Sequence, residues 1–155
     1  MRLPTEEFGR DYLQERIGRE FNLARHMGVV VESAGDAAVV LRAPLRANAN
    51  HRGTAFGGSL YSLAVLTGWA WLTRHLAAQN LSADAVIQES NTRFLIPVEG
   101  ELRASAASPP AVQIARFHGM LRRAGRGRIT VHVQIAQDGV PATLFEGVFV
   151  AVMSR

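Results

Sequence analysis

The longest apolar stretch of the chain is HRGTAFGGSLYSLAVLTGWAWLT, residues 51–73. It carries no charge from Gly53 to Thr73, and its apolar side chains would cover every side of a helix. Such a helix must be buried, either in lipid or inside a protein. The stretch approaches the roughly 20 residues needed to span a membrane. However, Gly57, Gly58, Gly68 and the interspersed hydroxyl residues favour a long helix enclosed by a sheet.

Strand patterns lie on both sides of this stretch. VVVES and AAVVLRA flank a turn at Gly35 and Asp36, which predicts a β-hairpin before the helix. After it, alternating positions predict strands over 85–96, 101–107, 128–136 and 143–153, with a helix ending at Gly125 inserted among them. A mostly antiparallel sheet flanked by helices is α+β, and one long helix wrapped by such a sheet is the hotdog fold.

Length and composition indicate one domain over residues 1–155, with residues 1–27 as a helical segment packed on it. The chain is 48% hydrophobic, which is sufficient for a single core. Cysteine is absent, so disulfides and thiolate nucleophiles are excluded. The first 20 residues are charged throughout and show no signal peptide, so we expect a cytoplasmic protein.

All 17 basic residues are arginine, in a chain of net charge +4. Arginine binds phosphate groups well through its planar set of donors. The densest cluster contains Arg122, Arg123, Arg126 and Arg128, although a solvated helix end is its simpler interpretation. We find no nucleic-acid recognition motif around it and expect no nucleic-acid partner.

The start of the apolar stretch carries a recognisable motif. Asn50, Gly53, Phe56, Gly57 and Gly58 resemble the N-x-x-G-x-x-H-G-G signature of the phenylacetyl-CoA type of hotdog thioesterases. The segments RGTAFGGSLYSLAVLTGWAWL, ESNTRFLIPV and EGVFVAV are more similar to a bacterial hotdog thioesterase domain that in some proteins follows a GNAT acetyltransferase domain. The resemblance implies hydrolysis of an acyl thioester of coenzyme A or acyl carrier protein, in a homodimer or larger homo-oligomer with sites between subunits.

The glycine pair also has a direct physical interpretation. Backbone N–H groups at a helix start lack intrahelical acceptors and lie at the positive end of the helix dipole. They can stabilise the oxyanion that forms when water attacks a thioester carbonyl. Alternatively, Gly57 and Gly58 only permit a tight entry into the helix.

The usual proton-transfer groups are replaced. In the phenylacetyl-CoA type, His precedes the glycine pair and an acidic residue follows seven positions after it, whereas this chain has Phe56 and Val65 there. Tyr61, Ser62, Gly68 and Trp69 share the helix face of Val65, and the hydroxyl groups of Tyr61 and Ser62 could orient water. Glu89, on the following strand, is the best remaining carboxylate for a general base, provided that it is half-buried.

Two functions therefore remain open. One is a thioesterase in which Gly57 and Gly58 bind the oxyanion, Asn50 positions thioester or water, and Glu89, Tyr61 or Ser62 handles the proton. The other is a hotdog module that binds acyl-CoA without hydrolysis. The candidate substrate-binding residues are Phe56, Asn48, Asn91, Arg93, Arg126 and Arg128. Coenzyme A would enter only as part of the substrate, and the histidine spacing predicts neither a cofactor nor a metal.

Overall fold

The computed structural model describes residues 7–154. The elements in chain order are α2 (Arg10–Glu20), α3 (Asn22–Met27), β1 (Val30–Ala34), β2 (Ala38–Ala43), a 3₁₀ turn (Leu45–Ala47), α4 (Gly57–Ala78), β3 (Ala83–Phe94), β4 (Leu102–Ala107), α5 (Ala111–Ala124), β5 (Arg126–Gln137) and β6 (Val140–Met153). The predicted N-terminal helical segment is present as α2 and α3, and its first six residues lie outside the described part.

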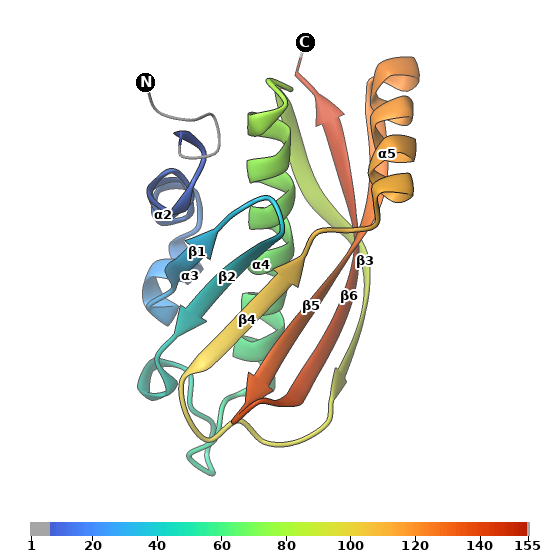
Figure 1. Cartoon of the computed structure of the whole chain (residues 1–155). Coiled ribbons are helices and arrows are strands. Elements are labelled where there is room, and N and C mark those ends of the chain that lie inside the picture. Colours follow the sequence, from blue (N-terminus) through green and yellow to red (C-terminus); the bar gives the residue numbers. More distant parts are fainter. Residues whose placement is uncertain (1–6, 155) are drawn as a thin grey trace.

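The six strands form one antiparallel sheet in the order β1-β2-β4-β5-β6-β3. The long helix α4 runs along one face of this sheet (Figure 1). The predicted α+β hotdog fold is therefore confirmed. β3 has a paired neighbour on one side only, so it forms an edge of the sheet.

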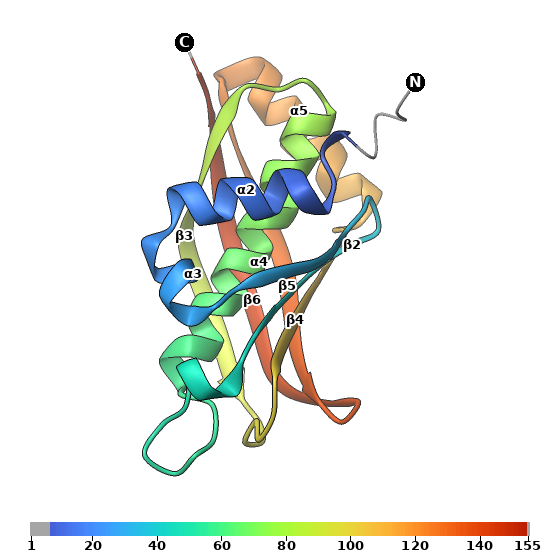
Figure 2. The same ribbon diagram turned by 90° about the vertical axis from the view of Figure 1, so that its left-hand side faces the viewer.

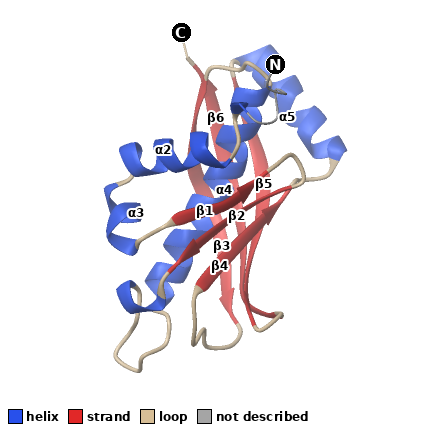
Figure 3. Ribbon diagram, turned by 60° about the vertical axis from the view of Figure 1, so that its left-hand side comes forward, coloured by secondary structure: helices blue, strands red, loops and turns tan. Residues whose placement is uncertain are grey.

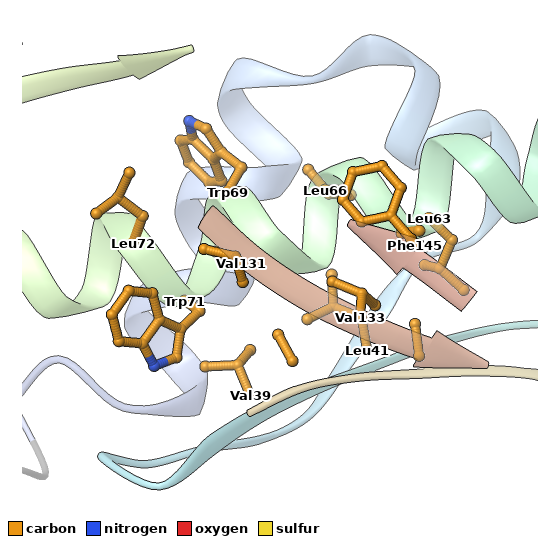
Figure 4. Packing of buried hydrophobic residues seen from close by; sticks show 14 of the residues in the cluster. Val39, Leu41, Leu63, Leu66, Trp69, Trp71, Leu72, Val131, Val133 and Phe145 are labelled. Atoms are coloured by element: carbon orange, nitrogen blue, oxygen red, sulfur yellow. The ribbon is translucent and has the colours of Figure 1, made fainter. Parts of the chain in front are cut away.

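α4 is buried because it lies between two layers. The sheet covers one side, and α2 and α3 cross its other side (Figure 2). Trp69 and Trp71 leave α4 on opposite sides, Trp69 toward the N-terminal helices and Trp71 toward Val39 of β2 (Figure 4). Gly68 faces the sheet, where the Phe149 ring takes the place that a side chain would need. Among residues 7–154, no helix combines the length and apolar character required to cross a membrane.

The last turns of α4 continue beyond the apolar stretch. Arg74 is only 3% exposed and donates to Asp36 of the β1–β2 turn at 2.7 Å. His75 stacks on Trp71, and its Nε2 lies 2.9 Å from Nε2 of His118 on α5. α5 packs mainly on β5 (Figure 3). These polar contacts fix the end of α4 to the β1–β2 turn and to α5.

A β-bulge interrupts β3. Its pairing with β6 shifts register between Ile87 and Glu89. Ala85 and Ile87 pack against the core on the α4 side, and after the bulge Ser90 faces α4. The extra residue at a bulge changes which side chains point to each face. The face assignments of the second half of β3 therefore differ from those that strict alternation predicts.

Candidate active site

The start of α4 presents two N–H groups without acceptors. The residue before the helix, Phe56, makes no side-chain capping bond. Its carbonyl accepts from the N–H groups of Ser59 at 2.9 Å and Leu60 at 3.0 Å. Within the described part of the chain, the N–H groups of Gly57 and Gly58 have no hydrogen-bond acceptor. Two donors at the positive end of the helix dipole are thus available to a negatively charged oxygen.

The two glycines have different surroundings. A Cβ on Gly58 would overlap the ring of Phe56, so only glycine allows this ring to lie against the helix start. A Cβ on Gly57 would lie 3.8 Å from the Phe94 ring of β3, an ordinary contact. Phe56 itself is 56% exposed. The close approach of the Phe56 ring explains why residue 58 is glycine, whereas steric contacts alone do not require glycine at position 57.

The loop before α4 is held by its two asparagines. Asn48 is buried, and its Nδ2 donates to the carbonyl oxygens of Met27 at 2.9 Å and Pro44 at 2.8 Å. The Oδ1 of Asn50 accepts from the N–H groups of Arg52 and Thr54, and its Nδ2 donates to Thr54 Oγ1.

These bonds are internal to the region that leads into α4. The loop is further fixed because Phe56 N–H donates to the Asn48 carbonyl at 2.7 Å. The structure therefore shows Asn48 and Asn50 positioning the backbone that delivers Phe56, Gly57 and Gly58.

A cavity of about 620 Å³ adjoins this helix start. It lies between α4, the N-terminal helices and the first half of β3, and its apolar lining exceeds its polar lining. Its walls are formed by Arg16, Glu20, Phe21, Leu23, Ala24, Met27, Tyr61, Ser62, Val65, Leu66, Trp69, Thr73, Ala83, Asp84, Ala85, Val86, Ile87 and Phe149. The sequence placed Tyr61, Ser62 and Trp69 on the helix face of Val65, and the structure brings all four to the cavity. Gly68, predicted on the same face, packs against the sheet instead.

The hydroxyl groups at the cavity differ in their partners. Tyr61 Oη lies 2.9 Å from Ser90 Oγ of β3, and either group can donate. Ser62 Oγ donates to the Gly58 carbonyl at 2.8 Å, within its own helix. Thr92, on the same face of β3 as Ser90, has a buried hydroxyl without a partner among the described residues. Ser90 and Thr92 were not predicted as site residues, although they are polar positions two apart on an otherwise apolar face.

Two acidic residues line the cavity, Asp84 and Glu20, and Glu20 is already paired. Arg16 Nε and Nη2 donate to the two carboxylate oxygens of Glu20 at 2.9 and 3.0 Å. The hydrogen bond from Arg16 holds the pKa of Glu20 below its usual value. The guanidinium also lies 5.4 Å from the centre of the Trp69 ring. Glu20 is thus a stable carboxylate that closes the rim, and it is poorly suited to accept a proton.

The other predicted residues lie across the sheet from the cavity. Glu89 shares a surface depression with Arg116 and Arg128, and Asn91 and Arg93 share another with His132. Glu89 is exposed, so the half-burial on which its role as a general base depended is absent. Its exposure follows from the bulge after Ile87, which turns Ser90 rather than Glu89 toward α4. Within one chain, Glu89 and Gly57 lie on opposite faces of the sheet.

The fold is shared with solved structures, some of which are described as thioesterases. A protein of unknown function from Chlorobaculum tepidum TLS is 28% identical with a TM-score of 0.90, and the match covers 94% of each chain. A "putative thioesterase" from Shewanella oneidensis is 25% identical with a TM-score of 0.84, over 95% of this chain and 99% of that one. The thioesterase HI1161 from Haemophilus influenzae shares the fold at 15% identity and a TM-score of 0.71, over 93% and 90%.

The family comparison covers nearly the whole chain. Residues 10–153 match the family model described as "Putative thioesterase (yiiD_Cterm)". The match includes the N-terminal helices, the loop before α4 and all six strands. The chain therefore belongs to this thioesterase family.

Proposed function

We propose that the protein hydrolyses an acyl thioester carried by coenzyme A or by acyl carrier protein. The observation that supports this most directly is the pair of acceptor-free N–H groups of Gly57 and Gly58 at the start of α4. They lie one helical turn from the cavity walls formed by Tyr61 and Ser62. A thioester can thus place its carbonyl oxygen at the amides and its acyl group in the cavity.

The amides would act on charge that develops during the reaction. Water adds to the thioester carbonyl carbon, and the electron pair of the C=O bond moves to oxygen. Donors placed at this oxyanion contribute about 3 kcal/mol each in comparable sites. The tetrahedral intermediate then breaks its C–S bond, which releases a carboxylate and a thiol. The backbone donors of Gly57 and Gly58 supply this stabilisation without a charged side chain.

The hydroxyl groups of Tyr61 and Ser90 are placed to orient the attacking water. Its two hydroxyls come from α4 and β3, and each can accept or donate a hydrogen bond. Val65 occupies the helix position at which the phenylacetyl-CoA type carries an acid, Glu20 is held by Arg16, and Asp84 lies six residues along β3 from Ser90. The proton would therefore pass through the hydroxyl pair to solvent. We expect the rate of thioester hydrolysis to rise with hydroxide concentration, and its pH dependence to show no titration of a carboxylate.

A homodimer through β3 would complete the site. β3 is a 12-residue edge strand, and Val86, Phe94, Leu95 and Ile96 are all more than 40% exposed on or next to it. Pairing with β3 of a second copy gives hydrogen-bond partners to the backbone groups of this edge and covers these side chains. A monomer at micromolar concentration in light scattering would refute this pairing.

The same symmetry suggests a place for the phosphates of coenzyme A. The Phe94 ring, at the end of β3, lies near Gly57. Two-fold antiparallel pairing places this end of β3 beside the start of β3 in the second copy. Arg126 and Arg128 lie two strands from that start, in register with Val152 and Val150. We therefore retain Arg126 and Arg128 as phosphate contacts, with Arg93 near the end of β3. An unchanged KM after replacing both Arg126 and Arg128 would remove that pair.

A panel of acyl-CoA esters tests the activity. Purified protein should release free thiol from at least one ester, at a rate proportional to protein concentration. The second candidate is a module that binds acyl-CoA without hydrolysis, and Val65 and Phe56 at the usual acid and histidine positions favour it. Calorimetric binding without thiol release would establish that alternative and refute hydrolysis.

A further inference from the structure

The cavity beside α4 has the shape of a binding site for a linear chain. It is a groove that is partly open to solvent, with a volume of about 620 Å³ and a mainly apolar lining. Its lining residues on α4 recur at positions 61, 62, 65, 66, 69 and 73, which follow one helix face. The cavity is therefore elongated along the helix.

Small side chains create this space. On β3, Ala83 and Ala85 line the cavity, and Ala24 of α3 lines it from the N-terminal cover. Leu66, Met27 and Phe149 provide apolar surface around them. A larger residue at any of the three alanines would fill the cavity without touching the amides of α4.

The length of the cavity sets a limit on its ligand. Tyr61 and Thr73 are twelve residues apart on α4, which corresponds to about 18 Å at the helical rise. An extended alkyl chain advances roughly 1.3 Å per carbon, given a C–C bond of about 1.5 Å. The cavity therefore has room for a chain of about 14 carbons.

We infer that this cavity binds the linear aliphatic acyl group of a medium- to long-chain thioester, with α2 and α3 as its cover. The direction of the acyl chain rests on the proposed function, which places the thioester carbonyl near Tyr61 and the Gly57 and Gly58 amides. The chain then runs between Trp69 and β3 toward Thr73. The Arg16 guanidinium over the Trp69 ring and the edge-on packing of Phe21 against Trp69 hold the cover against α4.

Non-hydrolysable S-alkyl-CoA thioethers test the inference by calorimetry, independently of any turnover. We expect affinity to rise from butyl through octyl to dodecyl, by up to about fourfold per buried methylene at about 0.8 kcal/mol each. Affinity should reach its maximum at tetradecyl, the length that fills the cavity, and should not rise further at hexadecyl. Equal affinity for all five chains would overturn the inference, and so would a rise from tetradecyl to hexadecyl.

Two filling variants locate the binding. Ala85→Phe should reduce dodecyl affinity to or below that of the octyl thioether while leaving butyl affinity unchanged, and Ala24→Leu should act in the same direction. Ala115→Phe, on the exposed face of α5, is the matched control and should change nothing. Equal loss at every length, or no loss with either filling variant, would overturn the assignment. Failed hydrolysis with intact length-dependent binding would refute only the proposed activity.

Discussion

Replacing Gly57 with proline removes one N–H group from the start of α4 and changes little else. Gly57 is the first residue of the helix, where proline's fixed φ is compatible with helical geometry. Phe56, the residue before it, has φ −64° and ψ 131°, which is the conformation that a following proline requires. The nearest atom to a Cβ at this position is 3.8 Å away. The variant should fold normally.

The expected effects on stability and rate point in opposite directions. The Gly57 N–H has no acceptor in the described chain, so its loss breaks no hydrogen bond. Proline also restricts the unfolded chain, which should raise the free energy of unfolding by about 0.4–1 kcal/mol. Loss of one oxyanion donor should lower kcat by about 100- to 1000-fold, or roughly 3–4 kcal/mol.

Gly57→Ala is the matched control, because it adds a Cβ but keeps the N–H. It should gain up to about 1 kcal/mol of helix stability and retain most of the activity. Thiol release gives kcat and KM, and urea denaturation gives stability for both variants. If the proline variant turns over within about threefold of the alanine variant, the Gly57 amide does not bind the oxyanion.

Three further predictions concern other parts of the chain. Tyr61→Phe and Ser90→Ala should each lower kcat by about 10- to 100-fold, because the attacking water would be misplaced. The double variant should lose little more activity than either single variant, because the two hydroxyls act as a pair. Additive losses of activity in a double-mutant cycle would refute this pairing. The pKa of His75 is lowered from 6.5 to about 4 by burial, then by His118 and Arg74, so the folded state binds fewer protons than the unfolded chain. Stability measured by urea denaturation should consequently fall as pH drops from 6.5 to 4, and His75→Gln should flatten this dependence. Gly68→Ala should destabilise by about 1–2 kcal/mol, because its Cβ would lie 2.8 Å from the Phe149 ring, whereas Gly18→Ala, with nothing within 4 Å, should be neutral or stabilising.

The main helix and the hairpins were predictable because their apolar periods are long and consistent. The apolar stretch from Gly57 onward could only be a buried helix, and turn residues at Gly35 and Gly139 separate clear strands. The opposite directions of Trp69 and Trp71 also follow from helical geometry, since residues two apart lie on nearly opposite sides. Of the two, only Trp69 lines the cavity.

The face of β3 that meets α4 was not predictable from alternation. Continuing the period from Ala85 and Ile87 would place Glu89, the candidate base, beside the helix. The bulge between Ile87 and Glu89 shifts the period, so Ser90 meets Tyr61 instead. No residue in this segment marks a bulge in the way that a glycine would. One extra residue in the strand thus replaces a carboxylate with a hydroxyl at the site.

Along α4, the groups proposed to act in hydrolysis lie apart from the residues proposed to select the length of the acyl chain. The first turn of α4 presents the donors of Gly57 and Gly58, whereas the cavity walls begin one turn later and depend on alanines of other elements. Ala24 and Ala85 line the cavity from α3 and β3, so enlarging them fills it without altering the backbone of Gly57 and Gly58. A change at these alanines should therefore alter which acyl chain binds while kcat for short chains is preserved. The donors at the first turn of α4 are backbone groups, so no charged side chain is needed there, and the sheet and the N-terminal helices can enclose the rest of the helix.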